Sequence, residues 1–395
     1  MTHGPGVAGG PDFTTPDFTA PDFTARPDLA ARRLGGSVMF ANDELFAEKE
    51  NLIKPEPPVF AAGDFGHKGK VYDGWETRRR REPGHDHAIV ALGVPGIVHG
   101  VVVDTAFFVG NYPPQVSVEA VCADGYPSPA ELAAMSWRPL VERTSARGGT
   151  ANYYAVADRH RWTHVRLAIY PDGGVARFRV HGEPVPDPDF LTGTIDLAAL
   201  ENGGALADCS DAFYSSAANL IMPGRAASMA DGWENARRRD GGFDYATFAL
   251  AASGRVTQVQ IDTSYFVGNA PGWAVLQAAT LPPSALVAES PVTEAPAADV
   301  PAADVPVAKA AVADAQWREL LPRVRLQPDT RHRFLVQPAE PATHVRLEVY
   351  PDGGLARLRV LGEIVPDALG RLRERYAASH QVPGTLTAEG DDRWH

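Results

Sequence analysis

Cysteine is nearly absent from this chain of 395 residues, which has only Cys122 and Cys209. Two cysteines cannot build a disulfide framework, and their spacing fits no C-x-x-C zinc motif. We interpret both as small buried side chains in a reducing compartment. The sequence also lacks an apolar run of about 18 residues, as a membrane-spanning helix needs, and the basic-then-apolar pattern of a secretion signal. It therefore predicts a cytoplasmic protein with no membrane partner.

Basic residues are in the minority: 37 Lys and Arg stand against 49 Asp and Glu, giving a formal net charge of −12. A protein that binds a phosphate backbone usually carries a basic surface, so nucleic acid is not expected as a partner. The sequence also has no P-loop, no G-x-G-x-x-G dinucleotide turn and no G-x-S-x-G nucleophile elbow. A nucleotide cofactor and a covalent nucleophile are therefore unsupported, and any arginine cluster must act locally.

An internal repeat spans nearly the whole chain. DTAFFVGN at 104–111 returns as DTSYFVGN at 262–269, and YPDGGVARFRVHGE at 170–183 returns as YPDGGLARLRVLGE at 350–363. Because the matching segments follow in the same order, we predict a duplicated domain. The predicted division is a disordered PDFT-rich leader at 1–26, a first repeat at 27–194, a second repeat at 195–375 with a flexible Ala/Pro insertion at about 282–315, and a tail at 376–395.

Short apolar runs rich in β-branched and aromatic residues predict the strands of each copy. In the first copy these runs are HAIVALG (87–93), GVVVDTAFFVG (100–110), VSVEAV (116–121), HVRLAIY (164–170) and ARFRVHG (176–182). The PDGG turn predicts a tight connection between two antiparallel strands. Only DLAARRL and DLAALEN have a helical pattern, each beginning at an Asp and ending at Gly-Gly. The sequence therefore predicts an all-β protein of two tandem antiparallel β-sandwiches.

An arginine cluster follows the same turn twice, in YDGWETRRRR (72–81) and in ADGWENARRR (230–239). Arginine suits a carboxylate ligand, because its planar fork forms two parallel charge-assisted hydrogen bonds. Glu76 is placed to orient a neighbouring guanidinium. Successive residues of an extended chain point to opposite faces, so at most two of the four arginines at 78–81 reach one ligand. The alternative is an ion-pair network that anchors the loop.

Two histidines distinguish the first copy, since Phe243 replaces His85 and Tyr245 replaces His87 in the second. Histidine titrates near neutral pH and suits acid–base catalysis. The first copy is therefore predicted to carry the chemistry and the second to support it, although a cleft shared by both copies is also open.

Metal ligation is a further alternative for the acidic and histidine residues. His85 and His87 have a spacing that a metal ion accepts, but on a strand they lie on the face opposite Asp86. Asp43 and Asp73, each repeated in the second copy, offer oxygen ligands for a structural calcium ion. We assign no metal ligand and no cofactor, although the sequence is compatible with a divalent metal ion.

The chain resembles the allantoicase family, in segments that cover about residues 28–370. The resemblance is carried by DLAARRLGG, FANDELFAEKENLI, GKVYDGWETRRRR, GHDHAIVALGVPG, VDTAFFVGNYPP and YPDGGVARFRVHGE, with CSDAFYSSAANLI, ADGWENARRR and DTSYFVGN in the second copy. It implies two jelly-roll sandwiches related to the discoidin or galactose-binding module, and hydrolysis of allantoate to ureidoglycolate and urea in purine catabolism. The PDFT leader, the insertion and His87, where an aromatic residue (usually Trp) is expected, depart from the family pattern.

Allantoate is a small anion whose central carbon carries one carboxylate and two ureido groups. We expect Arg79 or Arg80 to bind the carboxylate, with Glu76 orienting them. His85 and Asp86 are expected to move protons. Asn111 and Tyr112 are expected to pair with a ureido group.

A non-catalytic protein is the competing hypothesis. Discoidin-like modules often bind carbohydrate, and Trp137, Trp273 and Trp317 offer aromatic surfaces on which a sugar ring can stack. An inactive scaffold is a third hypothesis. The sequence is also compatible with a homo-oligomer.

Overall fold

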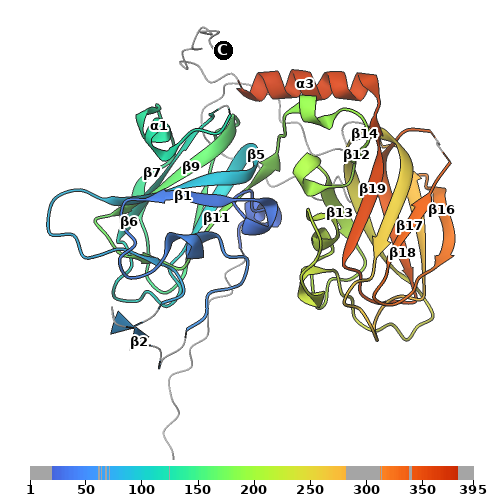
Figure 1. Cartoon of the computed structure of the whole chain (residues 1–395), viewed down its shortest axis with the longest axis horizontal. Coiled ribbons are helices and arrows are strands. Elements are labelled where there is room, and N and C mark those ends of the chain that lie inside the picture. The colour runs from blue at the N-terminus through green and yellow to red at the C-terminus, as the bar shows by residue number, and fades with distance from the viewer. Residues whose placement is uncertain are drawn as a thin grey trace, which may run out of the picture.

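Two β-sandwiches lie next to one another and account for most of the chain (Figure 1). The computed structural model describes residues 20–60, 63, 65–66, 69–70, 72–123, 125–281, 312, 314–337 and 340–380. Most of the predicted leader and of the predicted insertion, and residues 381–395 of the predicted tail, lie outside the described residues. The prediction of a mostly β protein built from two tandem repeats is confirmed.

The first sandwich is built around one long strand, β5, which belongs to both layers. Its first half pairs with β1 and β9, and its second half pairs with β8 and β11. The layer of β1, β5 and β9 continues through β6 to β7. The strands are β1 (Ser37–Ala41), β2 (Phe65–Gly66), β3 (Gly69–Lys70), β4 (Trp75–Glu76), β5 (Asp86–Asp104), β6 (Gln115–Val121), β7 (Arg138–Ser145), β8 (Ala151–Ala155), β9 (Arg161–Tyr170), β10 (Gly174–Val175) and β11 (Arg177–Pro184).

The second sandwich repeats this topology around β14. Its first half pairs with β13 and β18, and its second half pairs with β17 and β19. β15 joins β18 to β16, and β12 pairs with β19. The strands are β12 (Ile195–Asp196), β13 (Ala205–Cys209), β14 (Asp244–Asp262), β15 (Trp273–Ala279), β16 (Arg318–Arg325), β17 (Arg331–Leu335), β18 (Ala342–Tyr350) and β19 (Arg357–Ile364).

Two of the predicted strands are one strand. The runs at 87–93 and 100–110 were predicted separately, but β5 is continuous from Asp86 to Asp104 and shifts register between Ala91 and Gly96. The shift lets one strand leave the first layer and enter the second, as bulges do in bent strands. Residues 105–110 form a loop instead of the predicted strand end, and Phe107 there has a φ of 70°.

The expected antiparallel pairing across PDGG is wrong. β9, before the turn, pairs with β5 and β6, whereas β11, after it, pairs only with β5 among the strands at 37–184. Gly174 and Val175 instead form β10, which pairs with β4. PDGG therefore carries the chain from one layer to the other and brings it against the DGWE segment.

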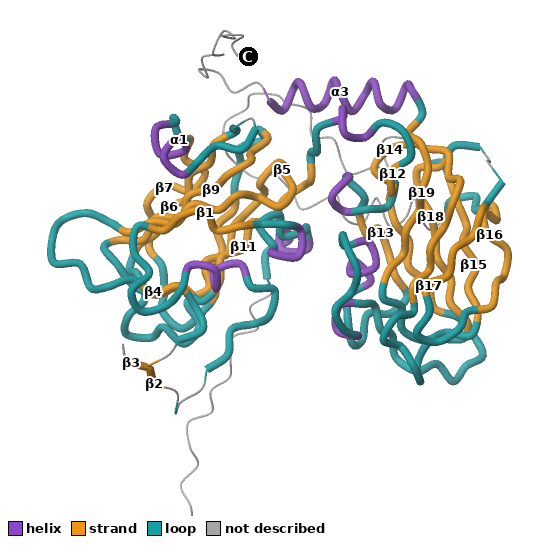
Figure 2. The backbone as a smooth tube through the Cα atoms, viewed as in Figure 1, coloured by secondary structure: helices purple, strands orange, loops and turns teal. Residues whose placement is uncertain are grey.

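The helices differ from the prediction in kind and in number. The DLAARRL and DLAALEN segments form short 3₁₀ turns, and a long helix, α3, follows the second sandwich (Figure 2). The 3₁₀ helices are η1 (Asp22–Ala25), η2 (Arg32–Leu34), η3 (Lys49–Ile53), η4 (Pro188–Leu191), η5 (Leu200–Asn202), η6 (Ala217–Ile221) and η7 (Met229–Asp231), and the α-helices are α1 (Pro129–Ala134) and α3 (Pro366–His380). The Gly-Gly that ends η2 is required, because a side chain at Gly36 would meet Ala30 O at 2.0 Å.

Each sandwich encloses an apolar core, Leu34 and Val94 of the first repeat pack into the core of the second, and α3 also contacts both repeats. Trp75 is fully buried in the first core and Trp233 in the second. Although α3 follows the second repeat, its Arg375 lies 2.5 Å from Glu183 of the first. The guanidinium of Arg161 lies 4.9 Å from the ring centroid of Tyr376. The helix thus braces the sandwiches against each other.

Three further observations concern the two cysteines, the end of the predicted leader and the length of the helices. Cys122 and Cys209 are half-buried instead of fully buried. The last residues of the predicted leader form η1, where the ring of Phe23 lies 6.0 Å from that of His181. No helix in the described part of the chain is long and apolar enough to cross a membrane.

Candidate functional site

The DGWE segment is fixed from beneath by core contacts. Trp75 is fully buried, and its Nε1 donates to the carbonyl of Asp43 at 2.8 Å. Asn51 Nδ2 donates to the carbonyl of Gly74 at 2.9 Å. Asp73 accepts from the buried Arg177 at 2.6 Å. Asp73, Gly74 and Trp75 therefore build the turn, and the residues after it are presented by a rigid base.

A buried carboxylate, Asp86, holds one of the four arginines. Arg80 Nη1 donates to Asp86 Oδ1 at 2.5 Å, and Asn42 Nδ2 donates to the same oxygen at 2.8 Å. Asp86 is only 1% exposed. The backbone N–H of Arg80 donates to Asp172 at 2.7 Å. Within the described residues, Asp86 Oδ2 and Arg80 Nε have no hydrogen-bond partner. Arg80 is thus anchored at both its backbone and its guanidinium.

Arg78 and Arg79 are both exposed, but only Arg78 is anchored by an ion pair. Arg78 Nη1 lies 2.5 Å from Asp43 Oδ2, and Arg78 N donates to Asp43 Oδ1 at 2.7 Å. For Arg79, no hydrogen bond or ion pair is found to any residue that the structure describes. The loop-anchoring ion-pair network that the sequence left as an alternative therefore exists, and it uses Arg78 and Arg80.

The expectation that Glu76 orients an arginine is wrong. Its carboxylate accepts instead from Asn111 Nδ2 at 2.7 Å. The strand pairing of β4 with β10 points Glu76 toward the loop at 105–114, which the linear sequence does not reveal. Burial raises the pKa of Glu76, and the hydrogen bond from Asn111 offsets only part of this effect. The raised pKa favours the neutral, proton-bearing form of the Glu76 carboxyl group.

His85 lies at the entrance to β5, beside Tyr170. Its ring centroid is 4.9 Å from that of Tyr170 and 6.0 Å from that of His87. Burial, followed by the charges of Arg166 and Arg80, lowers the pKa of His85. The imidazole is therefore neutral at pH 7 and able to accept a proton. No hydrogen bond joins the side chains of the neighbours His85 and Asp86, and the Asp86 carboxylate is bound by Arg80, so the structure shows no proton relay between them.

Tyr112 packs within the fold. A side chain at Gly148 would lie 2.3 Å from its ring, so the two residues are in close contact. Asn111, its neighbour, is held by Glu76 as described above. The structure therefore joins Asn111 to Glu76 but does not bring Tyr112 to the same carboxylate.

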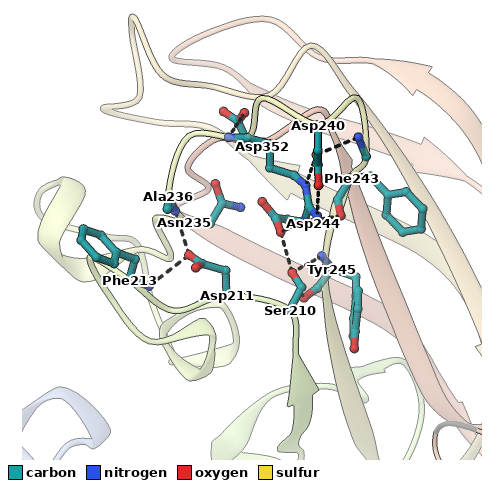
Figure 3. Close-up of polar contacts among 12 residues, drawn as sticks. Ser210, Asp211, Phe213, Asn235, Ala236, Asp240, Phe243, Asp244, Tyr245 and Asp352 are labelled. Atoms are coloured by element: carbon teal, nitrogen blue, oxygen red, sulfur yellow. Dashed lines mark hydrogen bonds and ion pairs between the residues drawn. The ribbon is translucent and has the colours of Figure 1, made fainter.

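The second copy keeps the buried Arg–Asp pair and the Glu–Asn pair of the first copy, with different residues around them. Figure 3 shows the polar contacts around Asp244 in the second copy. Arg238 Nη1 lies 2.6 Å from Asp244, which is 1% exposed, and Ser210 donates to that carboxylate at 2.8 Å. Glu234 accepts from Asn269 at 2.6 Å. The shared parts are thus a buried Arg–Asp pair and a Glu–Asn pair.

The aromatic positions separate the two copies. Phe243 packs against Tyr350 at 5.0 Å, in the arrangement of His85 with Tyr170. Tyr245 donates to Asp208 at 3.0 Å. The second copy therefore has no histidine at the two positions where the first has an ionisable imidazole.

The acidic and histidine residues do not assemble into a metal site in the described part of the chain, where no group of three or more His, Cys, Asp or Glu side chains is placed to hold an ion. Asp43 is bound by Arg78 and Asp73 by Arg177, so the two carboxylates considered for calcium each pair with an arginine.

The tryptophans considered for sugar stacking lie beside arginines. Arg166 lies over Trp137 at 4.6 Å, and Arg346 lies over Trp317 at 4.4 Å. Trp273 is 39% exposed but lies on β15 beside Arg323. Arginines therefore occupy the ring faces on which a sugar would stack.

Sequence reasoning missed several residues of the site. Asn42 and Asp172 hold Asp86 and the backbone of Arg80. Glu119 and Arg166 form an ion pair of 2.6 Å, and both act on the pKa of His85. The one sequence signal was the repeated PDGG segment, which contains Asp172 and its counterpart Asp352.

Comparisons with known proteins agree with this frame over nearly the whole chain. A family model of the allantoicase repeat matches residues 27–185 and 195–365. The chain belongs to the allantoicase family. It is similar to a probable allantoicase of Nocardia farcinica, with 51% identity over 342 residues that cover 86% of this chain and 94% of that protein. A probable allantoicase of Streptomyces coelicolor is 46% identical over 371 residues, covering 90% and 89%.

A solved structure of the allantoicase family shares the fold. The crystal structure of allantoicase from Saccharomyces cerevisiae has a TM-score of 0.67 and 32% identity, covering 85% of this chain and 92% of that one. The resemblance deduced from the repeated motifs is therefore confirmed, and the tandem repeat is the architecture of the allantoicase family.

Proposed function

We propose that this chain hydrolyses allantoate to ureidoglycolate and urea in purine catabolism. The observation that carries the proposal is the match of both repeats to the allantoicase family, with relatives up to 51% identical along nearly their whole length. The first repeat contains side chains of the kinds that this reaction needs, a base, a proton donor and a cation for the carboxylate.

The reaction breaks one bond between the central carbon and a ureido nitrogen. Water adds a hydroxyl to that carbon, and the departing nitrogen takes up a proton to leave as urea. The products, ureidoglycolate and urea, contain all the atoms of allantoate and water. A base that removes the proton of water and an acid that protonates the leaving nitrogen both lower the barrier.

Glu76 and His85 are the proposed proton carriers. The pKa of Glu76 is raised by burial and that of His85 is lowered, so both shifts favour the neutral forms. A neutral carboxyl group donates a proton and a neutral imidazole accepts one. Glu76 is therefore proposed as the acid for leaving urea and His85 as the base for water. Asp86, earlier expected to move protons, is instead a positioning residue for Arg80.

Arg79 is the proposed ligand of the substrate carboxylate. Arg78 and Arg80 are bound by Asp43 and Asp86, whereas Arg79 is exposed. A guanidinium that is not engaged can offer its whole fork to an incoming carboxylate. Asn111, held by Glu76, keeps its amide oxygen for a ureido N–H, and Tyr112 remains a candidate for the same group.

The proposed roles require a small-molecule substrate and side chains of this chain alone. Location in the cytoplasm and assembly into a homo-oligomer remain predictions. Urea release measured with and without a chelator tests whether a divalent metal ion is needed.

Release of urea from allantoate by the purified protein tests the proposal. We expect turnover in the absence of added metal and after treatment with a chelator. Turnover that the chelator abolishes and a divalent ion restores would add a metal to the mechanism. A folded protein that releases no urea under either condition, and that binds immobilised glycans, would establish the carbohydrate-binding alternative.

A further inference from the structure

The second sandwich contains a hollow lined by several arginines. It has a volume of about 130 Å³ and lies where β14, β17 and β19 meet the loop after η6, strands that lie side by side in Figure 1. Its lining residues are Gly224, Arg225, Gln260, Asp262, Arg331, Arg357 and Arg359. Four guanidinium groups therefore face one carboxylate.

The strand register places these charges in rows. Asp262 pairs with Arg331 on one side and with Arg357 on the other. In the next row, Gln260 lies opposite Arg359. Like charges on one sheet face destabilise it unless an opposite charge lies between them. Arg359 is partly compensated, because its guanidinium lies 3.5 Å from Asp196 and donates to the carbonyls of Met222 and Gly224. Among the lining residues, Arg225, Arg331 and Arg357 still outnumber the one carboxylate, Asp262.

The carboxylate of Asp262 is already engaged. Its Oδ1 accepts from the backbone N–H of Ser264 at 2.8 Å and from the Ser264 hydroxyl at 2.6 Å. One oxygen of Asp262 is therefore occupied by Ser264, and its single charge cannot balance all the arginines around it.

Arg357 is the innermost of the four arginines. It is only 6% exposed, and its Nη1 donates to the carbonyls of Asp231 and Ala356 at 2.7 Å. Its Nε has no hydrogen-bond partner among the residues that the structure describes. Burial, followed by the charge of Arg359, lowers the pKa of Arg357 to about 10. A buried cation with an unused donor favours an anion beside it.

The first repeat shows how the same arginine is satisfied without a ligand. Its counterpart, Arg177, donates from Nε to Glu56 O at 2.9 Å and from Nη2 to the Asp73 carboxylate at 2.6 Å. In the second repeat the matching carboxylate, Asp231, is bound by Arg33 of the first repeat at 2.8 Å. Asp231 thus forms its ion pair with Arg33, and Arg357 reaches only its backbone carbonyl.

Two further substitutions open the hollow to an anion in the second repeat only. Arg331 and Gln260 occupy the positions of Ala151 and Val102 in the first repeat, as the equivalent strand pairings show. The second repeat thus adds one cation and one amide at places where the first repeat has apolar side chains.

We propose that this hollow binds a small oxyanion with two negative charges, either inorganic phosphate or the phosphate group of a metabolite. Guanidinium forks bind phosphate oxygens in pairs, and a dianion compensates the excess charge better than a monoanion does. The site is separate from the proposed allantoate site in the first repeat and does not depend on that function.

Thermal melting of the full-length protein in inorganic phosphate, against sodium chloride of equal ionic strength, tests the proposal. A ligand that binds only the folded state raises the melting temperature with its concentration. We expect phosphate to raise it and chloride not to. Equal effects of the two salts would overturn the proposal, because the effect would then be ionic screening.

Matched arginine variants locate the site. Arg331→Gln and Arg225→Gln remove exposed lining residues, and Arg371→Gln removes an exposed arginine of α3 that does not line the hollow. We expect the first two to weaken phosphate binding in calorimetry by about 10-fold or more, the scale of a lost charge-assisted hydrogen bond, and Arg371→Gln to bind as the wild type does. Equal binding by all three variants would contradict the proposal.

The source of the phosphate group is distinguished by a second probe. Glycerol 3-phosphate that binds as tightly as inorganic phosphate would identify the phosphate group of a metabolite as the ligand. Binding of inorganic phosphate alone would identify the free ion. Binding of neither probe would overturn the proposal.

Discussion

Replacing Arg80 and Arg79 in turn separates anchoring from substrate binding. Arg80 Nη1 lies 2.5 Å from Asp86, which is 1% exposed. Removing one partner of a buried ion pair costs about 3–5 kcal/mol. The Arg80 side chain is itself 21% exposed and Asn42 still donates to Asp86, so we expect Arg80→Gln to cost about 2–3 kcal/mol. At about 2–4 °C per kcal/mol for a domain of this size, the melting temperature should fall by about 4–12 °C.

Arg79→Gln should behave in the opposite way. Its side chain is exposed, so the stability should change by less than about 0.5 kcal/mol. The lost charge-assisted hydrogen bonds to the substrate carboxylate, worth about 1.5–3 kcal/mol, should raise KM by about 10- to 100-fold.

Differential scanning calorimetry and steady-state urea release measure the two effects on the same preparations. Arg238→Gln is the matched control, because Arg238 pairs with the buried Asp244 in the second repeat. It should lower the melting temperature without raising KM. A stable Arg80→Gln protein with a raised KM would refute the reasoning, because Arg80 would then bind substrate.

Three further predictions concern the proton carriers and the core. His85→Asn should lower kcat by about 100-fold or more, the scale of a lost acid–base group. Phe243→Asn, at the equivalent position of the second repeat, should leave kcat unchanged. Normal turnover by His85→Asn would remove His85 from the mechanism. The pKa of His85 is lowered and its neutral form is the active one, so the acidic decline of kcat/KM should be centred below pH 6.5, while deprotonation of Glu76 governs the alkaline decline; an acidic decline centred above pH 6.5 would contradict this. Trp75→Ala should destabilise the protein by about 3–5 kcal/mol in denaturant unfolding, since Trp75 is fully buried; a loss below about 1 kcal/mol would show that the turn does not depend on it.

The repeated motifs made most of the strands and their order predictable. Runs such as 116–121 and 164–170 are each close to one strand, β6 and β9. Periodicity could not show that β5 is continuous. A strand that passes from one layer to the other changes its buried face at the bend, so its apolar pattern is interrupted there and resembles two separate strands. It also could not show which strand β11 joins, since PDGG resembles a hairpin turn locally while the pairing is decided by distant segments.

Helix α3 was missed for a related reason. Its sequence, PDALGRLRERYAASH, contains a glycine and many charged residues, so it carries only a weak apolar stripe. What stabilises it is contact with the first repeat, including the ion pair of Arg375 with Glu183. Such a contact depends on how the sandwiches are placed and is not written in the local sequence.

The candidate site was predictable in its membership but not in its pairings. Glu76, Arg80, Asp86 and Asn111 were all selected from the repeat, and the structure joins them in two pairs, Glu76 with Asn111 and Arg80 with Asp86. The sequence favoured Glu76 as the partner of an arginine because the two are close in the chain. The actual partners lie 35 residues from Glu76 and six from Arg80, and only the folded sheet decides between such choices.

The claim that the first repeat carries out the reaction is tested most directly by comparing Glu76→Gln with Glu234→Gln in urea release from allantoate. Glutamine keeps an acceptor for Asn111 or Asn269 but cannot donate the proton of a carboxyl group. We expect kcat to fall by about 100-fold or more in Glu76→Gln and by less than about 3-fold in Glu234→Gln. Equal losses in both variants, or full activity in Glu76→Gln, would contradict the claim that the first repeat carries out the reaction.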